Sequence, residues 1–207
     1  MLVIWGRLNS HNVKKIAWFA RELGIEHVRH DVGGKFGMDA AYRALNPNAL
    51  IPTIEDRTAD GDVVLWESNA ILRYLAGRYG APVFWAEDPA VRAVGDKWMD
   101  WQFSYADAQR DLFVNLVRRG AEERDQTAIE HSARACAVKM EILERALGET
   151  PWLSGAAFGI GDIPMGVYAH TYFALPIDRP ALPHVEDWYA RIRERPGYAE
   201  NVMIPLT

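Results

Sequence analysis

The sequence contains one cysteine among its 207 residues, Cys136. A single cysteine cannot form a disulfide within the chain or a Cys-x-x-Cys redox pair, so both are excluded. This favours a reducing compartment. Cys136 stands among alanines in a predicted helix, a pattern that predicts a small buried side chain rather than a nucleophile.

Long hydrophobic runs are also absent. No apolar stretch approaches the roughly 20 residues that a membrane-spanning helix needs. The first apolar run, Leu2–Trp5, is shorter than the core of a signal peptide, and no cleavage pattern follows it. We therefore expect a soluble, cytoplasmic protein with no membrane partner.

Basic residues are not in excess. The 23 lysines and arginines stand against 28 acidic residues and give a formal net charge of −5. A nucleic-acid partner is not expected, because binding one requires a basic face. His27 and His30 fall in a predicted surface strand without further residues at ligand spacing, so no metal is expected either. Any anionic ligand would have to be held by local groups.

The pattern of the chain changes near residue 80. Before it, strand, helix, strand, hairpin and helix patterns succeed one another and predict a small mixed sheet with helices against it. In the hairpin, Asp60-Gly61 supplies the turn between Thr53–Glu55 and Val63–Trp66. We predict an α+β domain over residues 1–79.

Residues 80–88 carry Gly and Pro without periodicity and predict a linker. Residues 89–207 are helical in pattern almost to the end and predict an all-α domain, whose first helix begins at Asp88-Pro89. The expected helices cover roughly residues 89–118, 124–147, 162–173 and 184–195.

Residues 45–76 combine features of a peptide-binding cleft. Ile51-Pro52 stands at the entrance of an apolar strand, one of the few places where a cis bond is tolerated. A cis bond would leave the Ile51 backbone free to pair with an extended peptide. A helix start at Glu67-Ser68 would offer unpaired N–H groups and a positive dipole end to a carboxylate. Taken singly, Pro52 could be a strand boundary and Ser68 a helix cap.

Ser10 and Asn12 fall where the first strand turns into the first helix. A hydroxyl, an amide N–H₂ and free backbone N–H groups there can donate to an anion and favour a thiolate over a thiol. Lowering a thiol pKa from about 8.5 by about two units requires roughly 2.7 kcal/mol. One or two donors in a partly dry site can supply this. The alternative is that Ser10 is an ordinary N-cap and Asn12 a solvated residue.

Taken together, these segments resemble the cytosolic glutathione transferase superfamily. The resemblance implies a thioredoxin-like N-terminal domain with a mixed four-stranded sheet, an all-helical C-terminal bundle that holds the second substrate, glutathione as co-substrate, and a homodimer. The matching segments are Ser10–Ile16, Asn46-Pro47, Ile51-Pro52, Trp66–Ile71 with Tyr74-Leu75, Phe158–Ile163, Trp188–Ile192 and Arg195-Pro196.

The resemblance also implies roles for individual residues. Glu67 would meet the amine of the γ-glutamyl end of glutathione, and Ser68 its carboxylate. Ile51 would pair with the cysteinyl backbone ahead of a cis Pro52.

For the sulfur, the resemblance implies two candidates. Ser10 would be the thiolate donor, as in the serine-type classes, and Asn12 matches the asparagine of bacterial members that act on disulfides. The second substrate is therefore a hydrophobic electrophile in a transferase or a disulfide in a reductase. A non-catalytic glutathione-binding protein is the third reading.

Two positions depart from the family pattern. Many relatives carry a lysine before the Ile-Pro pair, where it meets the glycine carboxylate, but this chain has Leu50. Lys35 is the first candidate to replace it and Arg7 the second. The Ser or Thr that usually stands three residues before Asp162 is Gly159, so the helix start is expected to lack half of its capping box.

An aromatic face on the first helix after the linker has two readings. Trp98, Trp101 and Tyr105 recur at spacings of three and four, which favours a core or dimer contact over a wall for a hydrophobic substrate. In the resembled family this helix borders the second-substrate pocket, so Tyr105 and Trp101 are candidate contacts there.

Overall fold

The computed structural model describes residues 1–207. Contacts divide the chain into two compact units. Unit 1 comprises Met1–Ala86 together with Arg195–Ile204, and unit 2 comprises Glu87–Glu194 together with Pro205–Thr207. Each unit buries apolar side chains of its own.

Unit 1 is built on a mixed sheet of four strands in the order β2-β1-β3-β4. β1 pairs in parallel with β2 and antiparallel with β3, and β3 and β4 form a hairpin. The predicted mixed sheet is confirmed. The strands are β1 (Leu2–Trp5), β2 (His27–His30), β3 (Thr53–Thr58) and β4 (Gly61–Trp66).

The hairpin differs in detail from its prediction. The turn is formed by Ala59 and Asp60, one residue earlier than expected, and both strands extend further toward it. Gly61 pairs with Thr58 and has a φ of +121°. Glycine adopts this backbone conformation more readily than other residues, so Gly61 serves as the first residue of β4 rather than as part of the turn.

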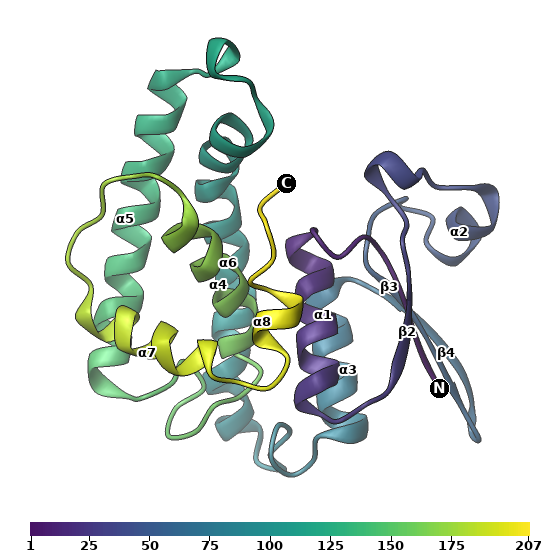
Figure 1. Ribbon diagram of the computed structural model, residues 1–207. Helices are drawn as coiled ribbons and strands as arrows, with labels where there is room; N and C mark the ends of the chain where they lie inside the picture. Colours follow the sequence, from purple (N-terminus) through teal and green to yellow (C-terminus); the bar gives the residue numbers. More distant parts are fainter. The chain divides into compact units, whose positions relative to one another are not determined.

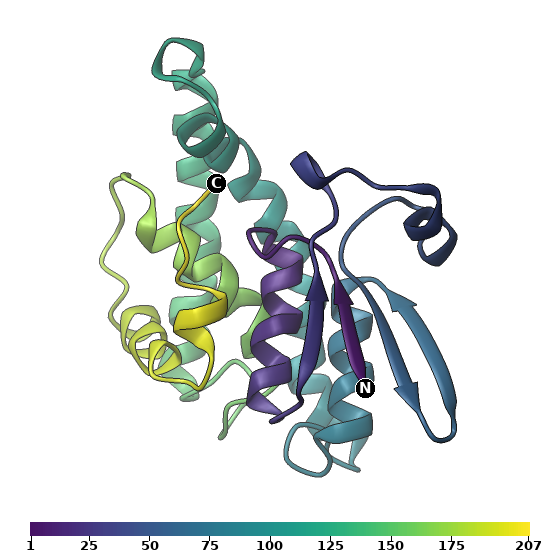
Figure 2. The same ribbon diagram turned by 45° about the vertical axis from the view of Figure 1, so that its right-hand side comes forward.

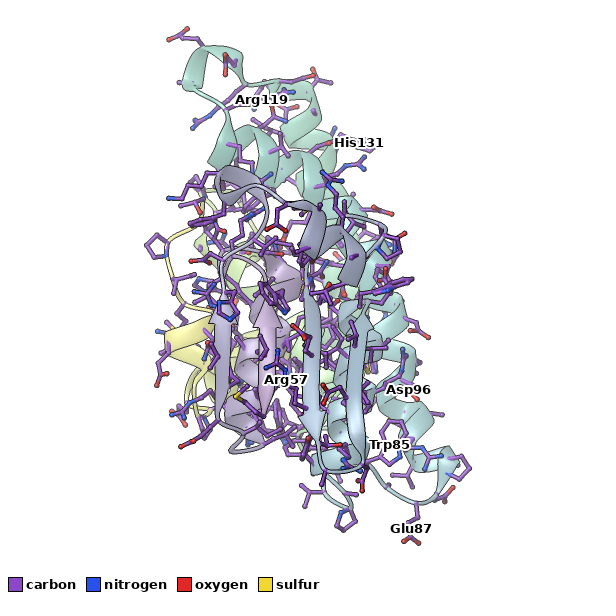
Figure 3. All side chains as sticks on the ribbon, turned by 90° about the vertical axis from the view of Figure 1, so that its right-hand side faces the viewer. Arg57, Trp85, Glu87, Asp96, Arg119 and His131 are labelled. Atoms are coloured by element: carbon purple, nitrogen blue, oxygen red, sulfur yellow. The ribbon has the colours of Figure 1, made fainter.

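Helices α1 (His11–Glu22) and α3 (Ser68–Tyr79) pack together over one face of the sheet (Figures 1 and 2). Ile4 and Ile54 of the sheet and Ile16 and Ile71 of the helices are fully buried. Figure 3 looks onto the opposite face, with Arg57 of β3 labelled. The short helices η1 (Gly34–Phe36) and α2 (Ala40–Leu45) lie in the connection from β2 to β3.

Residues 195–204 belong to unit 1 because they form hydrogen bonds and packing contacts with α1. Arg195 donates two hydrogen bonds to the Glu22 carboxylate, at 3.0 and 2.6 Å. Lys14 Nζ donates to the carbonyl of Val202 at 2.9 Å. The short helix α8 (Tyr198–Asn201) packs against α1 through an edge contact between Tyr198 and Trp18.

Unit 2 is helical, as predicted. α4 packs beside α5 and α6, and α7 packs on α5. Asp88 caps α4 by accepting from Ala90 N at 2.8 Å, with Pro89 first in the helix. No helix combines the length and apolar character needed to cross a membrane. The elements are α4 (Pro89–Phe113), a π-helical turn η2 (Val114–Arg118), η3 (Ala121–Glu123), α5 (Gln126–Glu149), α6 (Asp162–Ala174) and α7 (Pro183–Arg193).

At the start of α6 the capping box has only its Asp162 half, as predicted: no side chain caps the helix, and Asp162 accepts from Gly159 N at 3.1 Å. The hydroxyl of Ser154 accepts from Gly161 N at 3.0 Å, and a side-chain carbon on Gly159 would lie 2.8 Å from the Ser154 side chain. Ser154 therefore occupies the space that a side chain at position 159 would need, and it bonds to the residue before Asp162. Asp162 is fully buried and accepts from three backbone N–H groups, including that of Gly159, and from Trp188 Nε1. Burial raises the pKa of Asp162, and these donors oppose the rise.

Candidate functional site

The first helix of unit 1 begins with its Ser10 hydroxyl uncommitted to capping. Ser10 is the N-cap of α1, but its side chain makes no capping hydrogen bond, and no acidic residue lies in the first turn. Asn12, the second residue of the helix, is half-buried. The helix start therefore presents an unused hydroxyl, an amide and the positive end of the helix dipole. The reading of Ser10 as an ordinary side-chain cap is not supported.

The start of α3 is constrained at Glu67. This residue is the N-cap and has a φ of +72°, in the left-handed region that residues other than glycine rarely adopt and that often marks a functional site. Ser68 follows as the first helical residue and is 3% exposed. The predicted helix start is thus confirmed, but Glu67 and not Ser68 occupies the cap position.

A direct contact joins the two helix starts. The Ser68 hydroxyl donates to Asn12 Oδ1 at 3.3 Å. The sequence assigned Asn12 to the sulfur end of a ligand and Ser68 to its acidic head. Since the two side chains touch, the N-termini of α1 and α3 face one location, where their N–H groups and hydroxyls can hold an anionic molecule.

Lys15 is a neighbour of this location that the sequence reasoning left without a role. It is fully buried, and its Nζ lies 3.3 Å from Ser68 Oγ and 3.3 Å from Asn69 Oδ1. Burial lowers the pKa of Lys15 to about 7, and Glu67 opposes this shift. Every residue from Val13 to Ala20 is buried. This stretch of α1 therefore has no exposed polar face, and its amphipathic pattern could not indicate that Lys15 is buried.

The bond between Ile51 and Pro52 is cis. Ile51 packs against Gly6 and Gly33: a side-chain carbon on these glycines would lie 3.2 and 3.3 Å from it. Ile51 precedes the first strand-paired residue, Thr53, so the β-ladder does not use its backbone groups. This is the position that the sequence predicted for pairing with an extended peptide.

Buried polar groups brace the chain on either side of Ile51. Asn46 Nδ2 donates to the carbonyl of Leu50 at 2.9 Å and to Thr53 Oγ1 at 3.2 Å. Tyr42 bonds to the same two residues. Asn46, which the sequence showed only as part of an Asn-Pro pair, therefore fixes the path of the Ile51-Pro52 segment.

The two candidate cations occupy different surroundings. Lys35 is exposed, and its Nζ lies 5.2 Å from the centre of the Phe36 ring. Arg7 is half-buried and donates to Asn9 Oδ1 at 2.6 Å. It also lies against Gly34, where an added side-chain carbon would come within 3.0 Å of Arg7 Nε. Arg7 thus lines the loop beside the site, whereas Lys35 extends from its surface.

In unit 2 the structure corrects one of the two predicted pocket residues. Tyr105 is fully buried and accepts a hydrogen bond from Gln109 Nε2 at 3.1 Å. Burial raises the pKa of Tyr105 well above its ordinary value. This is a core position, because a side chain with no exposed surface cannot form an open wall. Trp101 is half-buried instead and lines a cavity of about 250 Å³ with Lys97, Trp98 and Ile142.

Two predictions about isolated residues are confirmed. Cys136 is fully buried in α5, and burial raises the pKa of its thiol to about 11. His27 and His30 lie on β2, whose side chains alternate between half-buried and exposed. This is the surface strand that the sequence indicated.

Comparison with known proteins is consistent with this arrangement. Residues 9–78 match a family model described as the N-terminal domain of glutathione S-transferase. The chain is 40% identical to glutathione S-transferase GstB of Escherichia coli K12, with 100% of both chains covered. It is 28% identical to the disulfide-bond oxidoreductase YfcG of the same strain, covering 93% of this chain and 90% of that one.

A solved structure is similar over the full length. It is a theta class glutathione S-transferase from Xanthomonas axonopodis pv. citri with glutathione bound, and it is 47% identical with a TM-score of 0.93. The alignment covers 100% of this chain and 99% of that chain. On the full-length identity, the matched N-terminal domain and the shared fold, the chain belongs to the cytosolic glutathione S-transferase superfamily.

Proposed function

We propose that this protein is a glutathione transferase that binds glutathione on unit 1 and activates its thiol as a thiolate for attack on an electrophilic small molecule. The observation that carries the proposal is the 3.3 Å contact between Ser68 and Asn12. It brings a group suited to the γ-glutamyl carboxylate next to a group suited to the sulfur. The bound glutathione named for the similar Xanthomonas structure supports it.

The binding roles follow from chemistry at each position. Glu67 is an exposed carboxylate at the start of α3 and meets the ligand amine. Ser68 meets the carboxylate through its N–H and hydroxyl. The Ile51 backbone pairs with the cysteinyl residue, as an exposed strand edge would. Lys35 or Arg7 meets the glycine carboxylate.

The chemical step needs a deprotonated sulfur. The thiol proton leaves to solvent, while the Ser10 hydroxyl or the Asn12 amide donates to the sulfur anion, which the α1 dipole also stabilises. The sulfur lone pair then forms a bond to carbon as the carbon–halogen bond breaks and halide leaves. With an activated alkene, the sulfur adds and the resulting carbanion takes a proton.

Disulfide reduction by the same thiolate is a second candidate. Its support is Asn12 at the helix start and the 28% identity to a protein named a disulfide-bond oxidoreductase. In that reaction the sulfur attacks one sulfur of a mixed disulfide and expels the other as a thiolate. A single cysteine buried in unit 2 is unsuited to this step, so glutathione itself would supply the attacking sulfur.

The remaining assignments are part of the same proposal. Residues 1–79 hold glutathione, residues 80–88 connect, and residues 89–207, apart from the segment 195–204 that belongs to unit 1, hold the second substrate. For that substrate the cavity beside Trp101 offers an apolar wall. A homodimer and a cytoplasmic location stay predictions drawn from the sequence and its resemblance.

The test has two stages. The protein is first applied to immobilised glutathione and eluted with free glutathione. It is then assayed for thiol conjugation with an aryl halide and for reduction of a glutathione mixed disulfide. Conjugation supports the transferase, and disulfide reduction alone supports the second candidate. Specific binding without turnover would show a non-catalytic glutathione-binding protein, and absence of binding would overturn the proposal.

A further inference from the structure

Lys15 places an ammonium group in the interior, directly behind the start of α3. It is 0% exposed, although lysine is almost never fully buried because removing its charge from water is costly. Its Nζ contacts two neutral acceptors, Ser68 Oγ and Asn69 Oδ1, each at 3.3 Å. The Glu67 carboxylate interacts electrostatically with Lys15, so the start of α3 combines a buried cation with an exposed anion.

Ser68 is the link between the lysine and the ligand location. Its hydroxyl contacts Lys15 Nζ on one side and Asn12 Oδ1 on the other. A hydroxyl has one proton to donate and two lone pairs to accept with. With Lys15 donating to the oxygen, the Ser68 proton remains available for an acceptor at the helix start. The lysine thus sets the direction in which Ser68 donates.

We infer that Lys15 is a positioning residue for the γ-glutamyl carboxylate of glutathione: its ammonium orients Ser68 and Asn69 and supplies the positive charge toward which that carboxylate binds. This inference rests on the proposed binding of glutathione. It also explains how a chain with a net charge of −5 can hold an anionic peptide through local charge.

The protonation of Lys15 links it to the ligand. Burial lowers its pKa to about 7, so part of the free protein carries a neutral Lys15 near neutral pH. A carboxylate bound nearby favours the charged form, and binding above pH 7 therefore draws a proton onto the lysine. The carboxylate of Glu67, the N-cap of α3, also raises the pKa of Lys15. On α1 its charged neighbour is Lys14, and His11 is a titratable residue at the first position.

Lys14 provides a matched control on the same helix. It is also buried, and burial lowers its pKa to about 8. Its Nζ, however, donates to the carbonyl of Val202 in the C-terminal segment. Replacing it removes a buried lysine of similar character without touching Ser68 or Asn69.

The experiment is calorimetric titration with S-methylglutathione, whose blocked thiol cannot release a proton. Titrations near pH 8 in two buffers of different ionisation enthalpy give the number of protons taken up on binding. The parent is expected to take up part of a proton. Lys15→Met is expected to bind at least tenfold more weakly with reduced uptake, and Lys14→Met to behave as the parent.

Lys15→Arg separates the effect of a positive charge at position 15 from the uptake of a proton there. Arginine stays protonated at this pH, so this variant is expected to bind more tightly than Lys15→Met while losing the uptake that belongs to Lys15. Uptake that persists in it belongs to other groups, such as His11. Circular dichroism checks folding, and if Lys15→Met is unfolded, the comparison of Lys15→Arg with the parent decides.

The inference is overturned if folded Lys15→Met binds as the parent does, or if Lys15→Arg takes up as many protons as the parent. Failure of the parent itself to bind S-methylglutathione is a different result. It would count against the proposed glutathione site as a whole.

Discussion

The Ser68 hydroxyl lies 3.3 Å from the amide oxygen of Asn12, so the first turns of α1 and α3 are joined by side chains 56 residues apart in sequence. This contact connects the two ends of the proposed glutathione site. A ligand that draws the Ser68 proton toward its carboxylate changes what Asn12 can offer to the sulfur. Binding and thiol activation should therefore depend on each other.

A double-mutant cycle tests this dependence. Ser68→Ala should raise the Kd for glutathione at least tenfold, because it removes a donor to the carboxylate. Asn12→Ala should act on the same contact, so the double variant should lose less than the two losses combined, with a coupling of about 0.5–3 kcal/mol. Kd values from calorimetry complete the cycle. Strictly additive losses would show that the contact carries no energy.

The choice between Ser10 and Asn12 as thiolate donor is tested by separate alanine variants. We expect one of them to lose at least tenfold in kcat, about 1.4 kcal/mol in the barrier, with glutathione binding largely kept in Ser10→Ala. Because the Ser10 side chain makes no capping bond, Ser10→Ala should cost less in stability than the roughly 1 kcal/mol of a typical N-cap.

The thiol itself provides the second measurement in this comparison. Ultraviolet absorbance of the bound thiolate, followed against pH, gives the pKa of bound glutathione. The variant that slows turnover should also raise this pKa toward the free value. If both variants turn over like the parent, neither residue is the sulfur donor.

The position before the Ile-Pro pair should accept the lysine that many relatives carry there. Leu50 is 61% exposed, so Leu50→Lys should leave stability within about 0.5 kcal/mol. It should lower the KM for glutathione several-fold and leave the KM for γ-glutamylcysteine, which lacks the glycine carboxylate, unchanged. Lys35→Met and Arg7→Met each remove a candidate cation, so the one that meets the glycine carboxylate should raise the KM for glutathione and leave that for γ-glutamylcysteine unchanged. If Leu50→Lys changed the KM values for glutathione and γ-glutamylcysteine equally, the new lysine would not contact the glycine carboxylate.

The fold could be predicted because its signals are local. The apolar strands, the Asp88-Pro89 start and the helical period after it depend on neighbouring residues, and the corresponding elements lie within a few residues of expectation. The hairpin turn was misplaced because Asp60-Gly61 is a strong turn signal, whereas the register of β3 and β4 places Gly61 in a strand. Register depends on the partner strand, which sequence spacing alone does not specify.

Local sequence patterns identify the candidate site residues but not the buried lysine behind them. Ser10, Asn12, Ile51 and Ser68 stand at helix starts or beside a proline, where local patterns mark them. Lys15 was missed because the contact that draws attention to it is with Ser68, 53 residues away.

Tyr105 was assigned to the substrate pocket through the resemblance, whereas its helical spacing favoured a core or dimer contact, and its full burial supports a core position. A helical period identifies the face on which an aromatic side chain lies, but not whether that face meets a cavity or the core. The contact of Ser154 with Gly161 likewise comes from a preceding loop, beyond the span of a capping motif.

Cys136 should be unreactive in the folded protein. Its thiol is fully buried with a pKa of about 11, so at pH 8 roughly one molecule in a thousand carries the thiolate. A thiol reagent such as dithionitrobenzoate should modify it only on unfolding in urea. Since folding raises this pKa from its ordinary 9.0, its ionisation should cost stability as pH rises from about 9 to 11. Rapid modification without denaturant would contradict the burial.

The start of α6 offers a swap experiment on stability. Ser154→Ala removes the acceptor for Gly161 N and should cost about 1 kcal/mol, as the loss of one hydrogen bond does. Gly159→Ser places a side-chain carbon 2.8 Å from Ser154 and should cost about 1–3 kcal/mol through overpacking. Combining Gly159→Ser with Ser154→Gly removes the clash and supplies a hydroxyl three residues before Asp162, as in a regular capping box.

Urea unfolding measures the free energy of each variant. The combined variant should be more stable than Gly159→Ser alone, even though it carries one more substitution and a glycine in a loop. Asp162→Ala gives a reference value for a large loss of stability at this helix start. It leaves four donors without their acceptor and should lower the free energy of unfolding by at least about 3 kcal/mol. If the two changes instead add, the space around Gly159 is not shared with Ser154.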